Sequence, residues 1–247
     1  MLNKKYIDER DTEIKYLKSQ YQKQKKILEI GISLADPKVL KYQIYLKKKF
    51  NCKLFAVDII DYKSVINRFK NLEIDKHYKF KKQNILNLFF NNNFFDLVCL
   101  ISTLEHVGFD KPKKSKDLKG VFERSKNKIK DIRKYQNQSK DYNALNKIYS
   151  KVKNGGNVII TVPFGSRQFG IYKDSLNLYS VYKEYSVSDI FNLVSKTKFS
   201  IKNILFYNKI KQNFKLVKNY DFKNIKFSKN VHDMEIKNIA CINLQKN

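Results

Sequence analysis

The sequence is short of several residue types, and some of these shortages exclude whole classes of protein. Only three cysteines occur among 247 residues, and the wide spacing of Cys52, Cys99 and Cys241 suits neither a zinc motif nor a disulfide framework. We therefore expect small buried cysteines in a reducing compartment, and no metal. No apolar run approaches the roughly 18–20 residues of a membrane span, and the N-terminus opens with charged residues. These absences favour a cytoplasmic protein without a membrane span.

Arginine is also scarce, although the formal net charge is +28. The sequence has 46 lysines but 5 arginines, together with 26 asparagines, 4 alanines and no tryptophan. Surfaces that bind nucleic acid favour arginine, because its planar guanidinium binds phosphate and stacks on bases. The charge therefore mostly reflects a compositional bias toward lysine, and nucleic acid is not the favoured partner.

Short apolar segments of β type alternate with longer helical ones, which is typical of a parallel sheet covered by helices on both faces. With 42% hydrophobic residues the chain can bury the core of one domain. We expect a single domain over 1–247, an N-terminal helical extension over 1–26 and a basic insertion or lid over 109–140. Strands are predicted at 27–30, 53–57, 78–80, 95–101, 157–162, 200–206 and 238–244, and helices at 6–26, 39–50, 64–71, 141–152 and 186–197.

The residues directly after the first two predicted strands carry the clearest chemical signal, because ligands of open α/β sheets bind beyond the carboxyl ends of the strands. A loop with small residues at Gly31, Ser33 and Ala35 follows the first strand, and Asp58 follows the second. A dinucleotide would need more glycines, so that bare backbone could approach a pyrophosphate. An acid after the second strand can accept hydrogen bonds from ribose hydroxyls. The pattern favours a nucleoside ligand without a pyrophosphate, such as S-adenosylmethionine.

Five segments, in this order and spacing, resemble those of the class I S-adenosylmethionine-dependent methyltransferases: ILEIGISLAD at 27–36, LFAVDI at 54–59, KQNILNLFF at 82–90, FDLVCLISTLEHVG at 95–108 and VKNGGNVIITVPFG at 152–165. The resemblance implies a Rossmann-like, seven-stranded, mostly parallel sheet with helices on both faces. A later region is similar to bacterial methyltransferases that act on small molecules or surface-glycan sugars. The implied activity is methyl transfer from S-adenosylmethionine to an oxygen or nitrogen of a small molecule or glycan precursor, with S-adenosylhomocysteine as product.

The resemblance also implies a set of site residues. Asp58 would bind the ribose, Ser102 would lie near the methyl donor, and Asn84 stands where the family often has an acid that binds the adenine. The implied cofactor-binding residues are Glu29, Gly31, Ser33, Ala35, Asp58, Ile59, Asn84, Ile85 and Ser102. The implied acceptor-binding residues are Phe164, Arg167, Tyr172 and Tyr185, and the implied catalytic pair is His106 as general base with Glu105 to orient it.

Each assignment has an alternative that the sequence leaves open. Asp58 can cap a turn, His106 can be a structural histidine, and the aromatic residues can pack in the core. Because the first loop lacks the three glycines of the family, the chain can also be a binding protein without catalysis. A third alternative is an RNA methyltransferase that uses the basic insertion, since residues 111–140 hold 12 Lys or Arg against 3 Asp or Glu.

Overall fold

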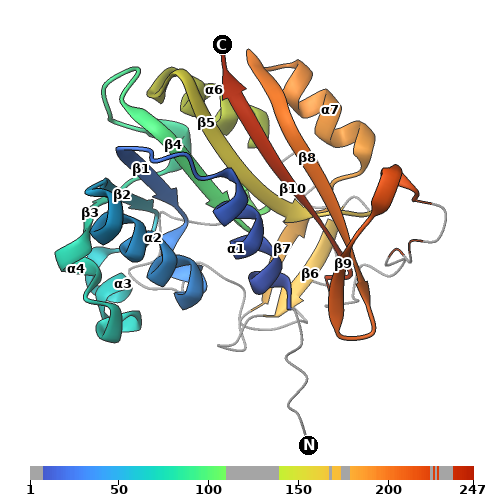
Figure 1. Ribbon diagram of the computed structural model, residues 1–247, viewed down its shortest axis with the longest axis horizontal. Coiled ribbons are helices and arrows are strands. Elements are labelled where there is room, and N and C mark those ends of the chain that lie inside the picture. The colour runs from blue at the N-terminus through green and yellow to red at the C-terminus, as the bar shows by residue number, and fades with distance from the viewer. Residues whose placement is uncertain are drawn as a thin grey trace, which may run out of the picture.

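The computed structural model describes residues 8–109, 139–166, 169–173, 179–222, 225, 227 and 236–247. Its strands are β1 (Lys26–Ile30), β2 (Lys53–Asp58), β3 (Tyr78–Lys82), β4 (Phe95–Ile101), β5 (Val152–Pro163), β6 (Phe169–Lys173), β7 (Tyr179–Lys183), β8 (Phe199–Ile210), β9 (Asn213–Leu216) and β10 (Asn238–Lys246). Eight of them form one sheet in the order β3-β2-β1-β4-β5-β10-β8-β9, and β6 pairs with β7 in a separate two-stranded sheet (Figure 1).

The large sheet is parallel from β3 to β5 and antiparallel from β5 to β9. The chain enters the sheet at β1 and builds outward through β2 and β3 on one side. It then returns to place β4 and β5 on the other side of β1. The strand order therefore reverses between β1 and β4, which is where an open α/β sheet forms its ligand crevice. The predicted α/β class with a mostly parallel sheet is confirmed.

The helices are α1 (Glu9–Gln20), α2 (Pro37–Phe50), α3 (Tyr62–Arg68), α4 (Ile74–His77), α6 (Asp141–Lys151) and α7 (Val187–Ser195). Local sequence explains where several of them begin. Asp36 caps α2 by accepting a hydrogen bond from the backbone N–H of Lys38 at 2.7 Å, and Pro37 takes the first helical position. Ser186 and Asp189 form a reciprocal capping box at the start of α7.

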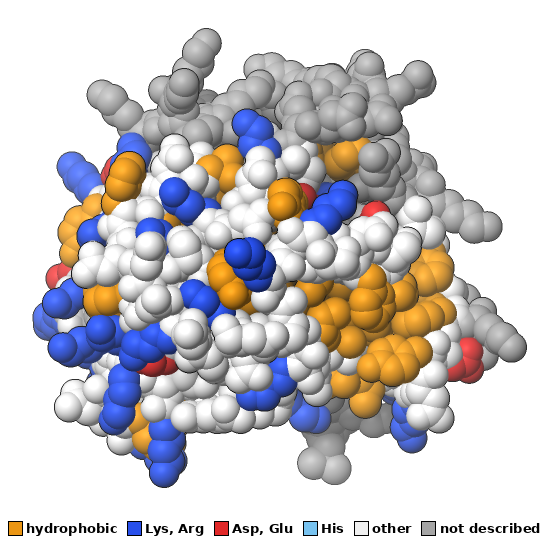
Figure 2. Space-filling model, turned by 90° about the horizontal axis from the view of Figure 1, so that it is seen from above, with side chains coloured by type: hydrophobic (Ala, Val, Ile, Leu, Met, Phe, Trp, Pro, Cys, Tyr) orange, Lys and Arg blue, Asp and Glu red, His pale blue; other side chains and the backbone are white. Residues whose placement is uncertain are grey.

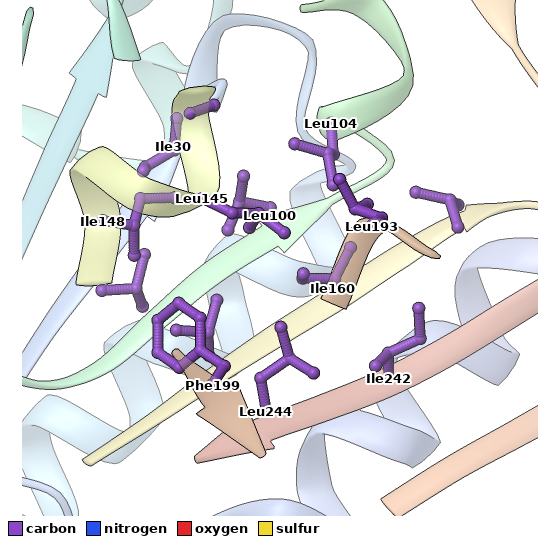
Figure 3. Close-up of a cluster of buried hydrophobic side chains, with 14 of the residues drawn as sticks. Ile30, Leu100, Leu104, Leu145, Ile148, Ile160, Leu193, Phe199, Ile242 and Leu244 are labelled. Carbon is purple, nitrogen blue, oxygen red and sulfur yellow. The ribbon is translucent and has the colours of Figure 1, made fainter. Parts of the chain in front are cut away.

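Each face of the sheet carries its own apolar cluster, because successive side chains of a strand point to opposite faces. Along β4, Cys99 and Ile101 join the cluster that includes α1 and α2, whereas Val98 and Leu100 join the cluster that includes α6 and α7. This burial on both faces explains why β4 is a continuous apolar run. Figure 3 shows the second cluster, in which side chains from the sheet meet those of α6 and α7: Ile30, Leu100, Leu104, Leu145, Ile148, Ile160, Leu193, Phe199, Ile242 and Leu244.

All seven predicted strands are present, and the structure adds β9 at the edge of the sheet. The prediction of seven strands was therefore one short. The sequence gives β9 little signal, because Phe214 is the one buried residue among its four. Residues 154–156, predicted as a turn, lie inside β5 as a bulge opposite a register shift between Phe95 and Leu97 of β4.

Two of the predicted segments lie partly outside the described residues. These are positions 1–7 of the predicted N-terminal extension and positions 110–138 of the predicted insertion, so the domain boundaries stay predictions. The three cysteines are buried and form no disulfide, as expected. In the described ranges, no helix has both the length and the apolar character that a membrane crossing requires. Figure 2 shows lysine side chains spread over the visible face, with few acidic ones among them.

We predict that Leu100→Ala lowers the free energy of unfolding by about 2–5 kcal/mol, because truncating a fully buried leucine leaves a cavity. Phe89→Ala is the control, since Phe89 is 73% exposed. Its truncation is expected to change stability by less than about 0.5 kcal/mol. Urea unfolding followed by circular dichroism measures both variants, and equal losses would contradict the packing described.

Candidate functional site

The loop after β1 (residues 31–35, the β1 loop) is held against the end of β2 by Asp58. One carboxylate oxygen of Asp58 accepts a hydrogen bond from the backbone N–H of Ser33 at 2.8 Å, and the other accepts from the N–H of Ile60 at 2.9 Å. Burial raises the pKa of this carboxyl although both donors favour its ionised form. Asp58 therefore does cap a turn, and it does so at the position where the sequence predicted a ribose ligand.

Gly31 brings the β1 loop into close contact with the loop after β4 (residues 102–106, the β4 loop). The φ of Gly31 is +85°, which disfavours any side chain, and a Cβ placed there would lie 2.5 Å from Oγ1 of Thr103. That hydroxyl lies 3.1 Å from each of the carbonyl oxygens of Ile30 and Ile101, and so links the ends of β1 and β4. The two loops meet at the point where the strand order reverses.

Glu29 lies within β1 and is buried against α2. Nε2 of Gln43 donates to a Glu29 carboxylate oxygen at 2.5 Å, and the Tyr78 hydroxyl donates to Oε1 of Gln43 at 2.7 Å. Burial raises the pKa of Glu29 to about 8. This chain of contacts ties β1 to α2 and β3, so Glu29 supports the β1 loop from beneath.

The predicted adenine-side residues lie at the carboxyl end of β3. Asn84 caps the short turn Ile85–Asn87 by accepting a hydrogen bond from the N–H of Leu86 at 2.9 Å. Ile85 is buried, Ile59 is half-buried, and the N–H of Gln83 donates to the carbonyl of Asp58 at 2.8 Å. The structure therefore brings Asn84, Ile85 and Ile59 to the same sheet edge as Asp58.

Helix α1 contributes residues that the sequence analysis did not assign to the site. Oε1 of Glu13 accepts hydrogen bonds from Oγ of Ser102 at 2.7 Å and from Oγ1 of Thr161 at 2.5 Å. Nη1 of Arg10 donates to Oγ of Ser102 at 2.5 Å and to Oε2 of Glu13 at 2.6 Å. The sequence signal was weak: a charged pair three residues apart, in a helix with few apolar residues. α1 is thus bonded to the carboxyl ends of β4 and β5.

Ser102 has an unusual backbone conformation for a serine. Its φ is +46°, a region whose occupation by residues other than glycine costs on the order of 1–3 kcal/mol and recurs at functional sites. Its N–H donates to the carbonyl oxygen of Thr161 at 3.1 Å and to Oγ1 of Thr161 at 2.9 Å, which holds this conformation. The predicted methyl-donor position is therefore the most constrained residue of the β4 loop.

Glu105 and His106 both lie in the short turn Leu104–His106 of the β4 loop, but they do not bond to each other. Nδ1 of His106 lies 3.1 Å from the carbonyl oxygen of Val181 in β7 and 3.1 Å from the hydroxyl of Ser180. A protonated Nδ1 donates to Val181, and in that tautomer Nε2 has the lone pair. Burial lowers the pKa of His106 to about 4 and raises the pKa of Glu105 well above its ordinary value. The predicted orientation of His106 by Glu105 is thus replaced by a contact with β7.

The predicted acceptor-binding aromatics are placed in the core. Phe164 is buried, and its ring lies 4.6 Å from that of Phe206. Tyr185 is fully buried and its hydroxyl donates to Asp141 at 3.0 Å. This placement corrects the expectation that these two residues line an acceptor pocket, and it fits the core-packing alternative. Arg167 and the side chain of Tyr172 lie outside the described residues.

Comparison with known proteins gives matches at the level of structure. No family model matches the sequence, and no curated protein does. A methyltransferase from Methanosarcina mazei, described as S-adenosylmethionine-dependent, aligns over 93% of this chain and 96% of its own, with a TM-score of 0.53 and 12% identity. A protein assigned to the same activity from Listeria monocytogenes aligns over 95% and 98%, with a TM-score of 0.56 and 11% identity.

A third solved structure, of a protein assigned as a methyltransferase from Bacillus halodurans, covers 94% of this chain and 97% of its own, with a TM-score of 0.55 and 9% identity. The chain has the class I methyltransferase fold. In this methyltransferase fold, the β1 loop, Asp58 and the β4 loop lie together at the switch point of the sheet. At such low identities the likeness concerns the fold, and the chemistry has to be argued from the site itself.

We predict that Gly31→Ala weakens cofactor binding at least tenfold and destabilises the protein more than Gly155→Ala does. Both glycines have positive φ, at +85° and +73°, so both substitutions incur a similar backbone strain of about 1 kcal/mol. A Cβ at Gly155 meets nothing within 4 Å, whereas one at Gly31 collides with Thr103. Thermal unfolding and calorimetric titration with S-adenosylhomocysteine separate the two effects. Equal behaviour of the variants would remove the close approach of the two loops from the site.

Proposed function

We propose that the protein is an S-adenosylmethionine-dependent methyltransferase that acts on a small molecule or a glycan precursor in the cytoplasm. The observation that carries this proposal is the closure of a small-residue β1 loop on Asp58 and Thr103 at the switch point of a methyltransferase fold. The loop has one glycine and the backbone N–H of Ser33 is already bonded to Asp58, which suits a nucleoside rather than a pyrophosphate.

The residues present fit this cofactor. The Asp58 carboxylate offers about four lone-pair sites. The N–H groups of Ser33 and Ile60 occupy one site on each oxygen, and the Ser33 hydroxyl and the Ile59 N–H also favour the ionised form. The ribose hydroxyls would compete with these last two groups for the remaining sites. Ile59 and Ile85 supply apolar surface for the adenine, with Asn84 beside them. Ala35 and Ser33 keep the loop free of bulk where the methionine part would bind. S-Adenosylmethionine, when bound, supplies a methyl group that is already activated on a sulfonium.

Because the methyl group arrives activated, the main tasks of the chain are to align the acceptor and to remove its proton. His106 is held by Val181 and its pKa is lowered to about 4, which makes it a weak base at neutral pH. Burial raises the pKa of Glu105, so its ionised form is a stronger base than an ordinary carboxylate. Its Oε2 atom has no hydrogen-bond partner in the described part of the structure. We therefore assign proton removal to Glu105 and the positioning of the β4 loop against β7 to His106.

An RNA substrate is the weaker alternative. The Lys and Arg side chains in Figure 2 lie mostly over the left and middle of the visible face, in separate groups rather than one stripe, and the predicted basic insertion lies largely outside the described residues. Methyl transfer to RNA alone, using labelled S-adenosylmethionine and fractionated cell extract, would replace the proposed acceptor class.

We predict that the wild-type chain binds S-adenosylhomocysteine and that Asp58→Asn weakens this binding at least tenfold. The amide of the variant would place its own N–H groups against donors, namely the backbone N–H groups of Ser33 and Ile60 and the hydroxyls of a bound ribose. Asp75→Asn makes the same change of charge at an exposed position and should leave the affinity unchanged. Isothermal titration calorimetry measures both. Absence of binding by the wild-type chain would instead favour a binding protein without catalysis.

We predict that Glu105→Gln lowers kcat by about 10²–10⁴-fold, which is the usual contribution of a general base. His106→Gln retains a side-chain amide that can donate to Val181, so it should change kcat by less than about tenfold. Single-turnover transfer of labelled methyl groups, measured after each variant is shown to fold by circular dichroism, compares the two. The reverse order of effects would return proton removal to His106.

A further inference from the structure

Three carboxylates gather where α1 meets the β4 loop, and we call them the acidic cluster: Glu9 and Glu13 of α1, and Glu105. Glu13 is completely buried and Glu105 is 2% exposed. The side chain of Glu9 is 19% exposed, so the cluster reaches solvent on that side. The sequence has 23 acidic residues against 51 basic ones, which makes a buried acidic group here unusual for this chain.

The acidic cluster has three carboxyl groups, and Arg10 is the cation that faces them among the residues that the structure describes. Arg10 contacts Glu13 at 2.6 Å and lies 3.7 Å from Glu9. Among the residues that the structure describes, Arg10 is the cation that lowers the pKa of Glu9 and Glu105. Burial nevertheless raises the pKa of Glu9 to about 7 and that of Glu105 well above its ordinary value. Both carboxyls therefore tend to hold a proton, and a cation bound beside them would favour their ionised forms and lower both pKa values.

Glu105 provides an independent indication that the acidic cluster binds a ligand. Its Oε2 atom is buried and has no hydrogen-bond partner in the described ranges. Glu105 follows Ser102 by three residues in the β4 loop, and Ser102 bonds to Glu13 and Arg10 of α1. Besides burial, the charges of Glu13, Arg10 and Glu9 influence the pKa of Glu105. A buried acceptor without a donor is unfavourable and rare in native structures. The ionised carboxylate calls for a hydrogen-bond donor, and a cationic donor would in addition replace the protons that burial favours on Glu9 and Glu105.

The acidic cluster lies beside the site proposed for the cofactor. Both Glu13 and Arg10 bond to Ser102, and the next residue, Thr103, is the one that touches the Gly31 position. A group held by the acidic cluster would therefore lie at the carboxyl end of β4, next to the β1 loop. An acceptor held there would therefore lie beside the proposed cofactor site.

We propose that the acidic cluster binds the methyl acceptor and that this acceptor is an amine that is positively charged in solution. The proposal rests on the proposed methyltransferase function and names its substrate class. A neutral alcohol would give Glu105 one hydrogen bond but would not favour the ionised forms of Glu9 and Glu105. An ammonium group provides up to three N–H donors together with the charge.

The same geometry accounts for the proton that an ammonium group has to lose before it can react. The ionised Glu105 takes one proton from the ammonium nitrogen and becomes a neutral carboxylic acid, which frees the nitrogen lone pair. A nitrogen–carbon bond then forms as the carbon–sulfur bond of the cofactor breaks, and the electron pair of that bond goes to sulfur. The product is a methylammonium ion, and Glu105 afterwards returns its proton to water.

The test measures binding of ethylamine, benzylamine and phenethylamine, each compared with the alcohol of the same carbon skeleton. The full chain is saturated with S-adenosylhomocysteine, which has no methyl group to transfer, and binding is followed by calorimetry. We expect at least one amine to bind about tenfold or more tightly than its alcohol. Its binding should also release protons, detected as a binding enthalpy that changes with the ionisation enthalpy of the buffer.

Two variants and a control assign this binding to the acidic cluster. Glu9→Gln and Glu105→Gln should each weaken amine binding about tenfold or more and leave the affinity for S-adenosylhomocysteine within about twofold. Glu73→Gln removes the same charge at an exposed position and should change neither. Because Glu9 is partly exposed, its variant keeps the test valid even where Glu105→Gln does not fold.

Three results overturn the proposal: no amine binds, amines bind no better than their alcohols, or the two variants leave amine affinity unchanged. Variants that weaken S-adenosylmethionine but not S-adenosylhomocysteine or amines would assign the acidic cluster to the sulfonium of the cofactor instead. Failure of the wild-type chain to bind S-adenosylhomocysteine rejects the proposed function. Normal binding of it without a preference for amines rejects only the acceptor class.

Discussion

The site depends on how closely the β1 loop approaches the β4 loop. Gly31 can touch Thr103 because it has no side chain, and the Thr103 hydroxyl lies against the carbonyl groups that end β1 and β4. Asp58 fixes the other side of the β1 loop through Ser33. With these contacts made, the ends of three parallel strands lie within reach of one ligand, and every further residue of the site is positioned relative to them.

The charge of the protein and the charge of its site have opposite signs. The chain carries +28, mostly as exposed lysines, whereas the buried groups at the carboxyl edge of the sheet are Asp58 and the acidic cluster. Surface lysines act through water and salt, which screen them beyond about 10 Å. Buried carboxylates act at contact distance in a medium of lower dielectric constant. The surface lysines therefore govern long-range electrostatics, whereas the buried carboxylates govern direct contacts with a ligand.

The sequence predicted well what depends on residues near one another in the chain. Strands, the cap at Asp36 and the small-residue loop at Gly31 each follow from a local pattern, and the structure contains all of them. It predicted poorly what depends on packing between distant elements. Phe164 and Tyr185 follow strands as site residues do, yet the core takes their side chains. Glu13 carries no local sign that it will bond to Ser102 and Thr161, because those contacts arise only when α1 packs on the finished sheet.

That packing also sets when the site can form during synthesis. α1 is made first, but its Gln20 bonds to Asn243 of β10, 223 residues later in the chain, and its Glu13 bonds to Thr161. At about 5–20 residues per second, α1 waits roughly 10–45 s for its last partner to be synthesised. A helix of 12 residues is marginal on its own in water. The contact of α1 with β10 can therefore form only when synthesis is nearly complete.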